Sequence, residues 1–317
     1  MSIPLIETHN LKKYFKTKAG YLHAVDDINI QINKGETLGI VGESGCGKST
    51  LGRTVLRLSA PTSGQILFDG KDITKYNHKQ MKIAKSDMQI IFQDPFSSLD
   101  PRMIVFDLIA EPIKEILGIK NKKELETKVF KLMETVGLSD KLVNVYPHEL
   151  DGGRRQRIGI ARTLSIDPQF IVCDEPVSAL DVSIQAQILN LLMDLQQERN
   201  LTYMFITHDL SVVKHISNKI SVMYLGQIVE TAMSEELFSN PLHPYTQALL
   251  AAIPRAKYYE KKKVREIIRG EVTSPIEPKP GCRFAPRCKY VKAECTLADI
   301  DYIEISKDHY VACVLHK

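Results

Sequence analysis

The sequence predicts an α/β fold built around a parallel sheet. Three short runs, at residues 37–41, 169–173 and 202–206, are almost entirely apolar, which is typical of strands buried on both faces of such a sheet. Each run is followed by a turn and then by a helical pattern, and strands that alternate with helices indicate the α/β class. A further apolar run at residues 88–92 predicts another strand.

The composition of the 317-residue chain is that of an ordinary globular protein, with 44% hydrophobic and 25% charged residues. Its 42 basic and 38 acidic residues leave a formal charge of only +4, which gives no electrostatic reason to expect a nucleic-acid partner. No apolar run approaches the roughly 20 residues that cross a bilayer, and residues 1–4 do not begin a basic segment followed by an apolar one. We therefore expect neither a transmembrane helix nor a signal peptide.

Residues 42–49, Gly-Glu-Ser-Gly-Cys-Gly-Lys-Ser, match the pattern G-x-x-x-x-G-K-[ST]. An expected strand precedes this segment and a helical pattern follows it over residues 48–58, as the pattern requires. In such a loop the backbone N–H groups surround phosphate oxygens, and the helix N-terminus favours an anion. The sequence therefore predicts a nucleoside triphosphate site in which Lys48 reaches the β- and γ-phosphates and Ser49 ligates Mg²⁺. The loop residues predicted to bind are Gly42, Glu43, Ser44, Gly45, Cys46, Gly47, Lys48, Ser49 and Thr50.

Polar side chains stand at the ends of the other expected strands. Asp174 and Glu175 end one apolar run, His208 follows another, and Gln93 closes a third. Functional groups of parallel sheets gather at the carboxyl ends of the strands, so we expect these side chains to surround the phosphates. Asp174 and Gln93 are predicted to hold Mg²⁺ together with Ser49, while Glu175 polarises the attacking water and His208 contacts the γ-phosphate. The predicted catalytic residues are Lys48, Glu175 and His208.

With these residues the sequence resembles the ATP-binding subunits of ABC transporters. The motifs that carry the resemblance follow one another in the family's order: the phosphate loop, Gln93, Gly152-Gly153, Asp174-Glu175, the segment 178–181 and His208. The resemblance spans about residues 5–254 and implies a RecA-like P-loop core, an antiparallel β element and a helical subdomain at about 95–165. It also implies two subunits that sandwich two ATP molecules, each bound by one chain's phosphate loop and the other's signature motif. In that family an aromatic residue near the N-terminus stacks on adenine, and Phe15, beside Tyr14, matches it best.

Two further segments resemble the dipeptide and oligopeptide importers of this family. Residues 93–102 are similar to their extended Gln loop, and His-Pro-Tyr-Thr at residues 243–246 is similar to the start of their C-terminal extension. The resemblance implies a second, paralogous ATPase subunit, two membrane permease subunits and an extracytoplasmic substrate-binding protein, with this chain peripheral on the cytoplasmic face of the cell membrane. The loop 96–103 and the helical subdomain are the expected permease contact. Nickel importers, ABC ATPases of DNA repair or chromosome structure, and a non-hydrolysing nucleotide-dependent module remain as alternatives.

The signature motif departs from the family's Leu-Ser-Gly-Gly-Gln, because the chain has Leu150, Asp151, Gly152, Gly153 and Arg154. Backbone donors of the two glycines remain, but a hydroxyl donor is replaced by a carboxylate. Unit charges of like sign 4 Å apart repel by about 4 kcal/mol at an effective dielectric of 20. Either Arg154 and Arg155 offset this charge, or Asp151 caps the helix that begins at Gly152. We expect an asymmetric heterodimer, in which ATP on this chain's phosphate loop is hydrolysed faster than ATP facing Asp151.

The composition changes after residue 254. Residues 255–281 carry charge runs and prolines typical of a linker, and the remaining tail holds Cys282, Cys288, Cys295 and Cys313. Their spacing is not that of common zinc ribbons; four thiolates suit Zn²⁺ or a [4Fe–4S] cluster, and unligated thiols are the third possibility. The tail of dipeptide-importer ATPases has a similar cysteine pattern, which implies a structural [4Fe–4S] cluster. The predicted organisation is an ATPase domain over 1–254, a linker over 255–281 and a Cys-rich extension over 282–317.

Overall fold

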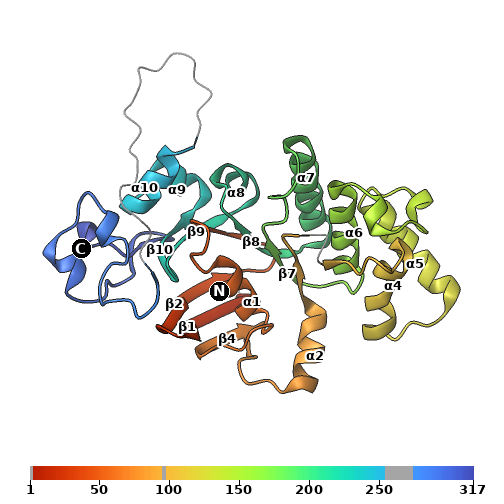
Figure 1. Ribbon diagram of the computed structural model, residues 1–317, viewed down its shortest axis with the longest axis horizontal. Helices are drawn as coiled ribbons and strands as arrows, with labels where there is room; N and C mark the ends of the chain where they lie inside the picture. Colours follow the sequence, from red (N-terminus) through yellow and green to blue (C-terminus); the bar gives the residue numbers. More distant parts are fainter. Residues whose placement is uncertain (1–2, 95–97, 254–273) are drawn as a thin grey trace, which may run out of the picture.

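The computed structural model describes residues 3–94, 98–253 and 274–317. Residues 95–97 of the predicted Gln loop and most of the predicted linker therefore lie outside the described residues. The described chain forms two sheets with helices packed against them, with the helical region at one end of the molecule and the tail at the other (Figure 1). Among the helices in these ranges, none is both long enough and apolar enough to cross a bilayer.

The larger sheet has eight strands in the order β11-β12-β10-β9-β3-β8-β7-β6. From β9 to β6 the neighbouring strands are parallel, and every residue of β3, β7 and β8 is buried, as the continuous apolar runs predicted. This arrangement confirms the predicted α/β class. The strands are β3 (Thr37–Val41), β6 (Met88–Ile91), β7 (Phe170–Asp174), β8 (Thr202–Thr207), β9 (Lys219–Tyr224), β10 (Gln227–Met233), β11 (Ile303–Ser306) and β12 (His309–Val311).

The smaller sheet is antiparallel, with the order β2-β1-β4-β5. Ile28, Ile30 and Ile32 are buried and alternate with exposed polar residues, because a strand with one solvated face turns every second side chain inward. This sheet lies beside helix α1 (Lys48–Val55) in Figure 1 and brings the N-terminal strands toward the phosphate loop. Its strands are β1 (Ile6–Thr17), β2 (Gly20–Ile32), β4 (Ser63–Phe68) and β5 (Lys71–Asp72).

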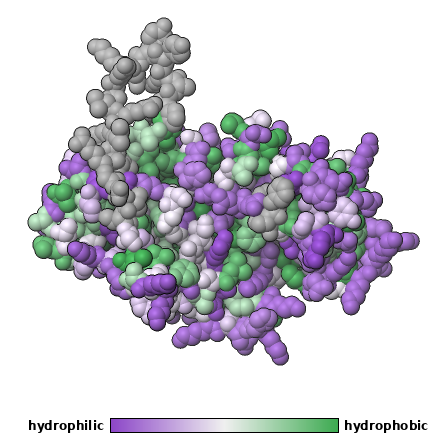
Figure 2. Space-filling view, viewed as in Figure 1, coloured by the Kyte–Doolittle hydropathy of each residue, from purple (hydrophilic) through white to green (hydrophobic). Residues whose placement is uncertain are grey.

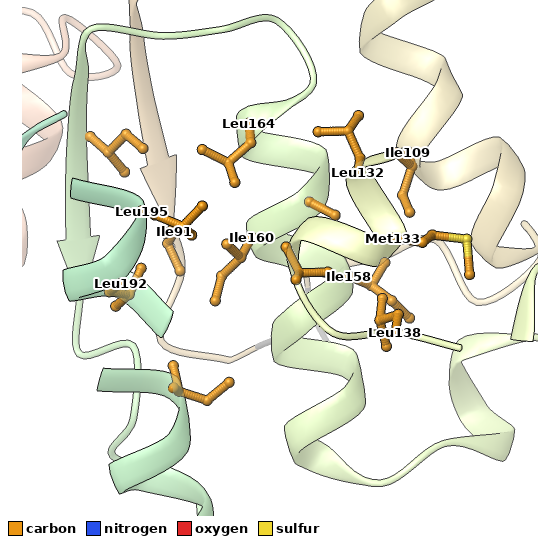
Figure 3. Packing of buried hydrophobic residues seen from close by; sticks show 14 of the residues in the cluster. Ile91, Ile109, Leu132, Met133, Leu138, Ile158, Ile160, Leu164, Leu192 and Leu195 are labelled. Carbon is orange, nitrogen blue, oxygen red and sulfur yellow. The ribbon is translucent and has the colours of Figure 1, made fainter. Parts of the chain in front are cut away.

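Helix α6 links the helical region to the sheet. On one side Ile158 packs with Ile109, Leu132 and Met133 of α4 and α5, and on the other Ile160 and Leu164 approach strand β6 and helix α7 (Figure 3). On the face shown in Figure 2, most of the side chains over this region are hydrophilic, with a few hydrophobic ones among them. The helices are α1 (Lys48–Val55), α2 (His78–Asp87), α4 (Val105–Ile116), α5 (Lys122–Thr135), α6 (Gly152–Leu164), α7 (Val182–Arg199), α8 (Leu210–Ile216), α9 (Ser234–Ser239) and α10 (Pro244–Ala251).

The tail is joined to the core sheet. Strand β12 pairs with β10, where Val311 lies opposite Glu230, and β11 completes a short hairpin at this edge. His309 and Glu230 are both fully buried, with His309 Nε2 2.9 Å from Glu230 Oε1. Nearer the nucleotide loop, Ile276 forms a β-bridge with Leu22 of β2. The tail residues therefore extend the core instead of forming a separate body.

Candidate functional site

The phosphate loop (residues 42–50) connects the end of β3 to the start of α1, as its sequence predicts. Gly47 has φ 106° and caps α1, and a Cβ there would lie 2.0 Å from the carbonyl oxygen of Ala24. A Cβ on Gly42 would lie 2.1 Å from the carbonyl oxygen of Met223. Only glycine fits at these two positions, so the loop packs tightly against β2 and β9.

Lys48 is held by the loop itself. Its side-chain Nζ donates hydrogen bonds to the carbonyl oxygens of Gly42, at 2.8 Å, and Glu43, at 3.0 Å. The residue is 5% exposed, so its ammonium lies against the inside of the loop. Cys46 is buried beside it, and burial raises the pKa of its thiol. A cation enclosed by a ring of small residues can balance the charge of a phosphate.

Asp174 lies at the end of β7 and faces the start of α1. The Ser49 hydroxyl donates to Asp174 Oδ1 at 2.6 Å, and Arg53 Nη2 lies 3.9 Å from Oδ2. Burial raises the pKa of Asp174, while the Ser49 hydrogen bond and the Arg53 charge act in the opposite direction. Hydroxyl and carboxylate oxygens are the ligands that Mg²⁺ prefers. The donor set of Ser49 and Asp174 therefore fits this ion.

Glu175 is brought together with two of the other predicted residues. Gln93 Nε2 donates to Glu175 Oε2 at 3.1 Å, and His208 Nδ1 lies 3.2 Å from Oε1. Glu175 has φ 48°, in the left-handed region, a conformation that costs a non-glycine residue of order 1 kcal/mol or more and concentrates at functional sites. Its backbone N–H donates to Ile206 O of β8 at 2.9 Å. This turn places the side chain of Glu175 at the carboxyl ends of β7 and β8.

One cavity of about 710 Å³ collects most of the predicted nucleotide residues. The phosphate loop, Gln93, Glu175, His208 and Phe15 all line it, and Asp174 lies behind Ser49. Phe15 is 39% exposed. Tyr14 is not among the residues that line the cavity; its hydroxyl donates to Asp26 and its ring stacks on His23 with centroids 3.8 Å apart. Phe15 is therefore the one of the two aromatic rings that faces the cavity.

The signature segment lies at the start of α6. Asp151 caps this helix, because its Oδ1 accepts from the Arg154 N–H at 2.8 Å, and Arg154 Nε lies 3.4 Å from Oδ2. Both interactions left open by the sequence are thus present, the cap and the pairing with Arg154. Arg155 donates to the carbonyl oxygens of Pro147 and His148. Among the described residues that line the 710 Å³ cavity, none belongs to the signature, so the signature lies apart from this chain's own phosphate loop.

Several residues behind and around the cavity were not identified from the sequence. Leu249 and Pro275 line it, and the hydroxyl of Tyr245 accepts from the Glu43 N–H at 3.0 Å. Arg287 of the tail forms an ion pair with the Glu43 carboxylate, with Nη1 2.9 Å from Oε2. The segment 243–246 was noted for its resemblance, but no local pattern connects residues that are more than 200 positions apart. Only the folded chain brings them together.

The predicted [4Fe–4S] cluster is wrong, and the correction applies equally to Zn²⁺. Within residues 3–94, 98–253 and 274–317, no group of three or more His, Cys, Asp or Glu side chains is placed to hold a metal ion. The four thiols line an apolar cavity of about 10 Å³. This volume is no larger than the volume that a single water molecule requires. Burial raises the pKa of Cys282 to about 11 and also raises the pKa values of Cys288 and Cys313, which favours thiols over thiolates. The predicted ligands were Cys282, Cys288, Cys295 and Cys313.

Aromatic packing and ion pairs hold this part of the tail. Phe284 is buried and packs edge-on against Tyr224, with ring centroids 5.3 Å apart, and also contacts Tyr245. Arg283 is paired with Asp26 of β2. Since these partners lie on β2, β9 and α10, the tail is fastened to the nucleotide-binding half of the molecule without a metal.

Comparisons with known proteins agree with this geometry. A family model described as "ABC transporter" matches residues 25–178, and one described as "Oligopeptide/dipeptide transporter, C-terminal region" matches residues 229–295. The chain is 48% identical over 321 residues to the oligopeptide transport ATP-binding protein AppF of Bacillus subtilis, covering 98% of this chain and 97% of that one. It is 52% identical over 291 residues to OppF of the same organism, an oligopeptide transport ATP-binding protein, covering 89% and 95%.

Solved structures share the fold. CbiO1 from Clostridium perfringens, part of an ABC transporter complex, superposes with a TM-score of 0.67 and 28% identity over 75% of this chain and 92% of that one. The dimeric structure of MJ0796, a bacterial ABC transporter cassette, has a TM-score of 0.67 and 27% identity over 72% and 98%. A second dimeric structure of MJ0796, with ADP and Pi bound in a post-hydrolysis state, matches at 26% identity.

Proposed function

The chain belongs to the ABC transporter ATP-binding family, within its oligopeptide and dipeptide importer branch, and from this premise we propose how its residues bind and hydrolyse ATP for peptide import. It is an ATPase subunit of a peptide ABC importer. The single observation that carries the residue assignment is the position of Glu175 between Gln93 and His208, at the wall of the cavity that the phosphate loop also lines.

ATP lies along this cavity in the proposed complex. The adenine stacks on Phe15, and the phosphates lie in the cradle of backbone N–H groups between Gly42 and Thr50. Lys48, now hydrogen-bonded to loop carbonyls, is close enough to the loop interior to turn toward the β- and γ-phosphates. Burial of this ammonium strengthens its attraction to the phosphate charge.

The proposed chemistry places a water between Glu175 and the γ-phosphate. Glu175 accepts a proton from this water as it attacks, Gln93 orients the carboxylate, and His208 donates to the γ-phosphate. Ser49, Asp174 and Gln93 would hold Mg²⁺, which supplies charge neutralisation for the phosphate oxygens when bound. Gln93 can serve both roles, because its amide nitrogen faces Glu175 and its oxygen remains for a cation.

The site is completed by a second subunit in the proposed assembly. The signature residues Asp151, Gly152, Gly153 and Arg154 stand apart from this chain's cavity and face the ATP of a paralogous partner. Asp151 is engaged as a helix cap and with Arg154, which supports a slower second site rather than loss of the interface. The chain is proposed to lie on the cytoplasmic face of the membrane, held by two permease subunits and served by an extracytoplasmic binding protein.

The test uses the complete importer reconstituted in vesicles with its binding protein. We expect uptake of radiolabelled di- to hexapeptides that requires ATP, and loss of both uptake and ATP turnover after Lys48→Ala. Lys48→Ala that turned over ATP like the unaltered complex would overturn the proposed site. Nickel uptake without peptide uptake would support the nickel-importer alternative.

A further inference from the structure

The tail contacts the phosphate loop at Glu43, a residue that also lines the cavity. Arg287 lies in a short 3₁₀ helix (Ala285–Arg287), and its Nη1 and Nη2 donate to the two carboxylate oxygens of Glu43 at 2.9 and 3.2 Å. The hydroxyl of Tyr224 accepts from the same guanidinium at 3.3 Å. The Arg287 side chain is only 8% exposed. Such a bidentate, charge-assisted pair fixes both orientation and distance.

Glu43 is held at its backbone as well as at its side chain. Its N–H donates to the hydroxyl of Tyr245 at 3.0 Å, and its carbonyl oxygen accepts from Lys48 Nζ at 3.0 Å. Glu43, the residue that pairs with Arg287 of the tail, is therefore one of the two residues whose carbonyl oxygens accept from Lys48 Nζ. A movement of the Glu43 backbone therefore also moves a carbonyl oxygen to which Lys48 Nζ donates.

The charge of Glu43 also matters for a triphosphate ligand. Glu43 lines the cavity, and a carboxylate there repels an anionic nucleotide. The guanidinium of Arg287 neutralises this carboxylate at close range. Without Arg287 the loop would present an unbalanced negative charge beside the phosphates.

We propose that Arg287 is a positioning residue for the nucleotide site, and that by pairing with Glu43 it lets the C-terminal extension set the affinity for ATP. This inference rests on the proposed function, because it takes ATP as the ligand of the cavity. The C-terminal extension thereby takes part in nucleotide binding, although Arg287 lies 244 positions from Glu43 along the chain.

The experiment measures equilibrium binding of radiolabelled ATP and steady-state kinetics of the complete importer. Arg287→Gln is expected to weaken ATP binding about tenfold and to raise KM similarly, with kcat changed less than twofold. Glu43→Gln alone is expected to tighten ATP binding about threefold, since it leaves the positive charge of Arg287 without its carboxylate partner beside the phosphates. The double variant Glu43→Gln/Arg287→Gln is expected to return the affinity to within about threefold of the unaltered importer.

A matched control breaks another ion pair between tail and core. Asp308→Asn removes the pairing with Lys219, 3.0 Å apart, and neither residue lines the cavity. This variant is expected to bind ATP unchanged. An equal loss in Asp308→Asn and Arg287→Gln, or no recovery in the double variant, would show that Arg287 only fastens the tail and would overturn the proposal.

The outcomes separate this inference from the function on which it rests. ATP binding lost in Lys48→Ala but normal in Arg287→Gln would refute only the role of Arg287. ATP binding retained in Lys48→Ala would refute the proposed site itself. If Arg287→Gln did not fold, Glu43→Gln would still decide the matter, because weaker ATP binding by that variant contradicts the electrostatic argument.

Discussion

His208 Nδ1 lies 3.2 Å from Glu175 Oε1, across the ends of the neighbouring parallel strands β7 and β8. The imidazole is well exposed, with 57% of its side chain accessible, whereas Glu175 retains 13%. The carboxylate is therefore enclosed and oriented before any ligand arrives. A base that is held in place loses little freedom when a water comes between it and a phosphate.

Glu175→Gln is expected to lower ATP turnover by the complete importer by about 100-fold or more, since it removes the proposed base while keeping the shape of the side chain. ATP affinity should remain within about threefold of the unaltered value. Single-turnover hydrolysis and equilibrium binding measure the two effects separately. Turnover that survives in Glu175→Gln would assign the base to another residue.

Phe15→Ala is expected to weaken ATP binding about tenfold, because it removes the ring that faces the cavity. Phe15→Tyr keeps an aromatic face and should bind ATP nearly as well as the unaltered chain. Isothermal titration of the assembled complex gives both affinities. Equal binding by Phe15→Ala and Phe15→Tyr would show that the base does not stack on residue 15.

Asp151→Ala is expected to lower the free energy of unfolding by about 1 kcal/mol, because α6 loses its cap. Asp151→Ser keeps a capping oxygen without the charge and should unfold like the unaltered chain. In the importer, Asp151→Ser is also expected to raise total ATP turnover, since in the proposed assembly it restores a hydroxyl donor that faces the ATP of the paralogous subunit. Faster turnover in Asp151→Ala as well would attribute the effect to charge alone, and no gain in either variant would contradict the proposed slow site.

His243 gives the fold a specific response to acid. Its Nδ1 accepts from the Tyr245 N–H at 3.1 Å and caps α10, and burial, assisted by the charge of His316, lowers its pKa to about 3. Below its unfolded pKa of about 6.5 the unfolded chain binds a proton that the folded chain does not, so stability falls as the pH falls. We expect a loss of about 2 kcal/mol between pH 6.5 and pH 5 from this residue.

The comparison variant is His243→Asn, which keeps a capping acceptor and does not titrate. Denaturant unfolding of both chains at several pH values should show a shallower pH dependence in the variant, whatever its stability at pH 7. Parallel pH profiles would mean that the pKa of His243 is the same in the folded and unfolded chains, which contradicts this prediction.

The sequence predicted the parallel strands because they are buried on both faces and therefore read as unbroken apolar runs. The phosphate loop and the polar residues at the strand ends could be found for the same reason, since each follows such a run. The long strands β1 and β2 carry one solvated face and gave no such run, so only the resemblance to a family implied them.

What the sequence could not predict depends on contacts between distant residues. The pairing of Arg287 with Glu43 joins positions 244 apart, and neither residue has a local pattern that names the other. The resemblance of the cysteine pattern to that of dipeptide-importer ATPases implied a metal cluster, but a pattern along the chain does not measure the space between the thiols. In the folded chain, the part of the tail near these cysteines is held instead by the buried ring of Phe284, which packs against Tyr224 and Tyr245.

The hairpin of β11 and β12 determines which backbone groups the large sheet presents to other molecules. It hydrogen-bonds to β10, whose N–H and C=O groups would otherwise form an open sheet border available to a neighbouring protein. With the hairpin in place, the edge strand of the sheet is β11, which has four residues, carries Glu304 and is followed by Lys307. Proteolytic removal of this hairpin would therefore leave β10 as an exposed edge strand. The shortened protein would aggregate through this edge although its catalytic residues remain in place.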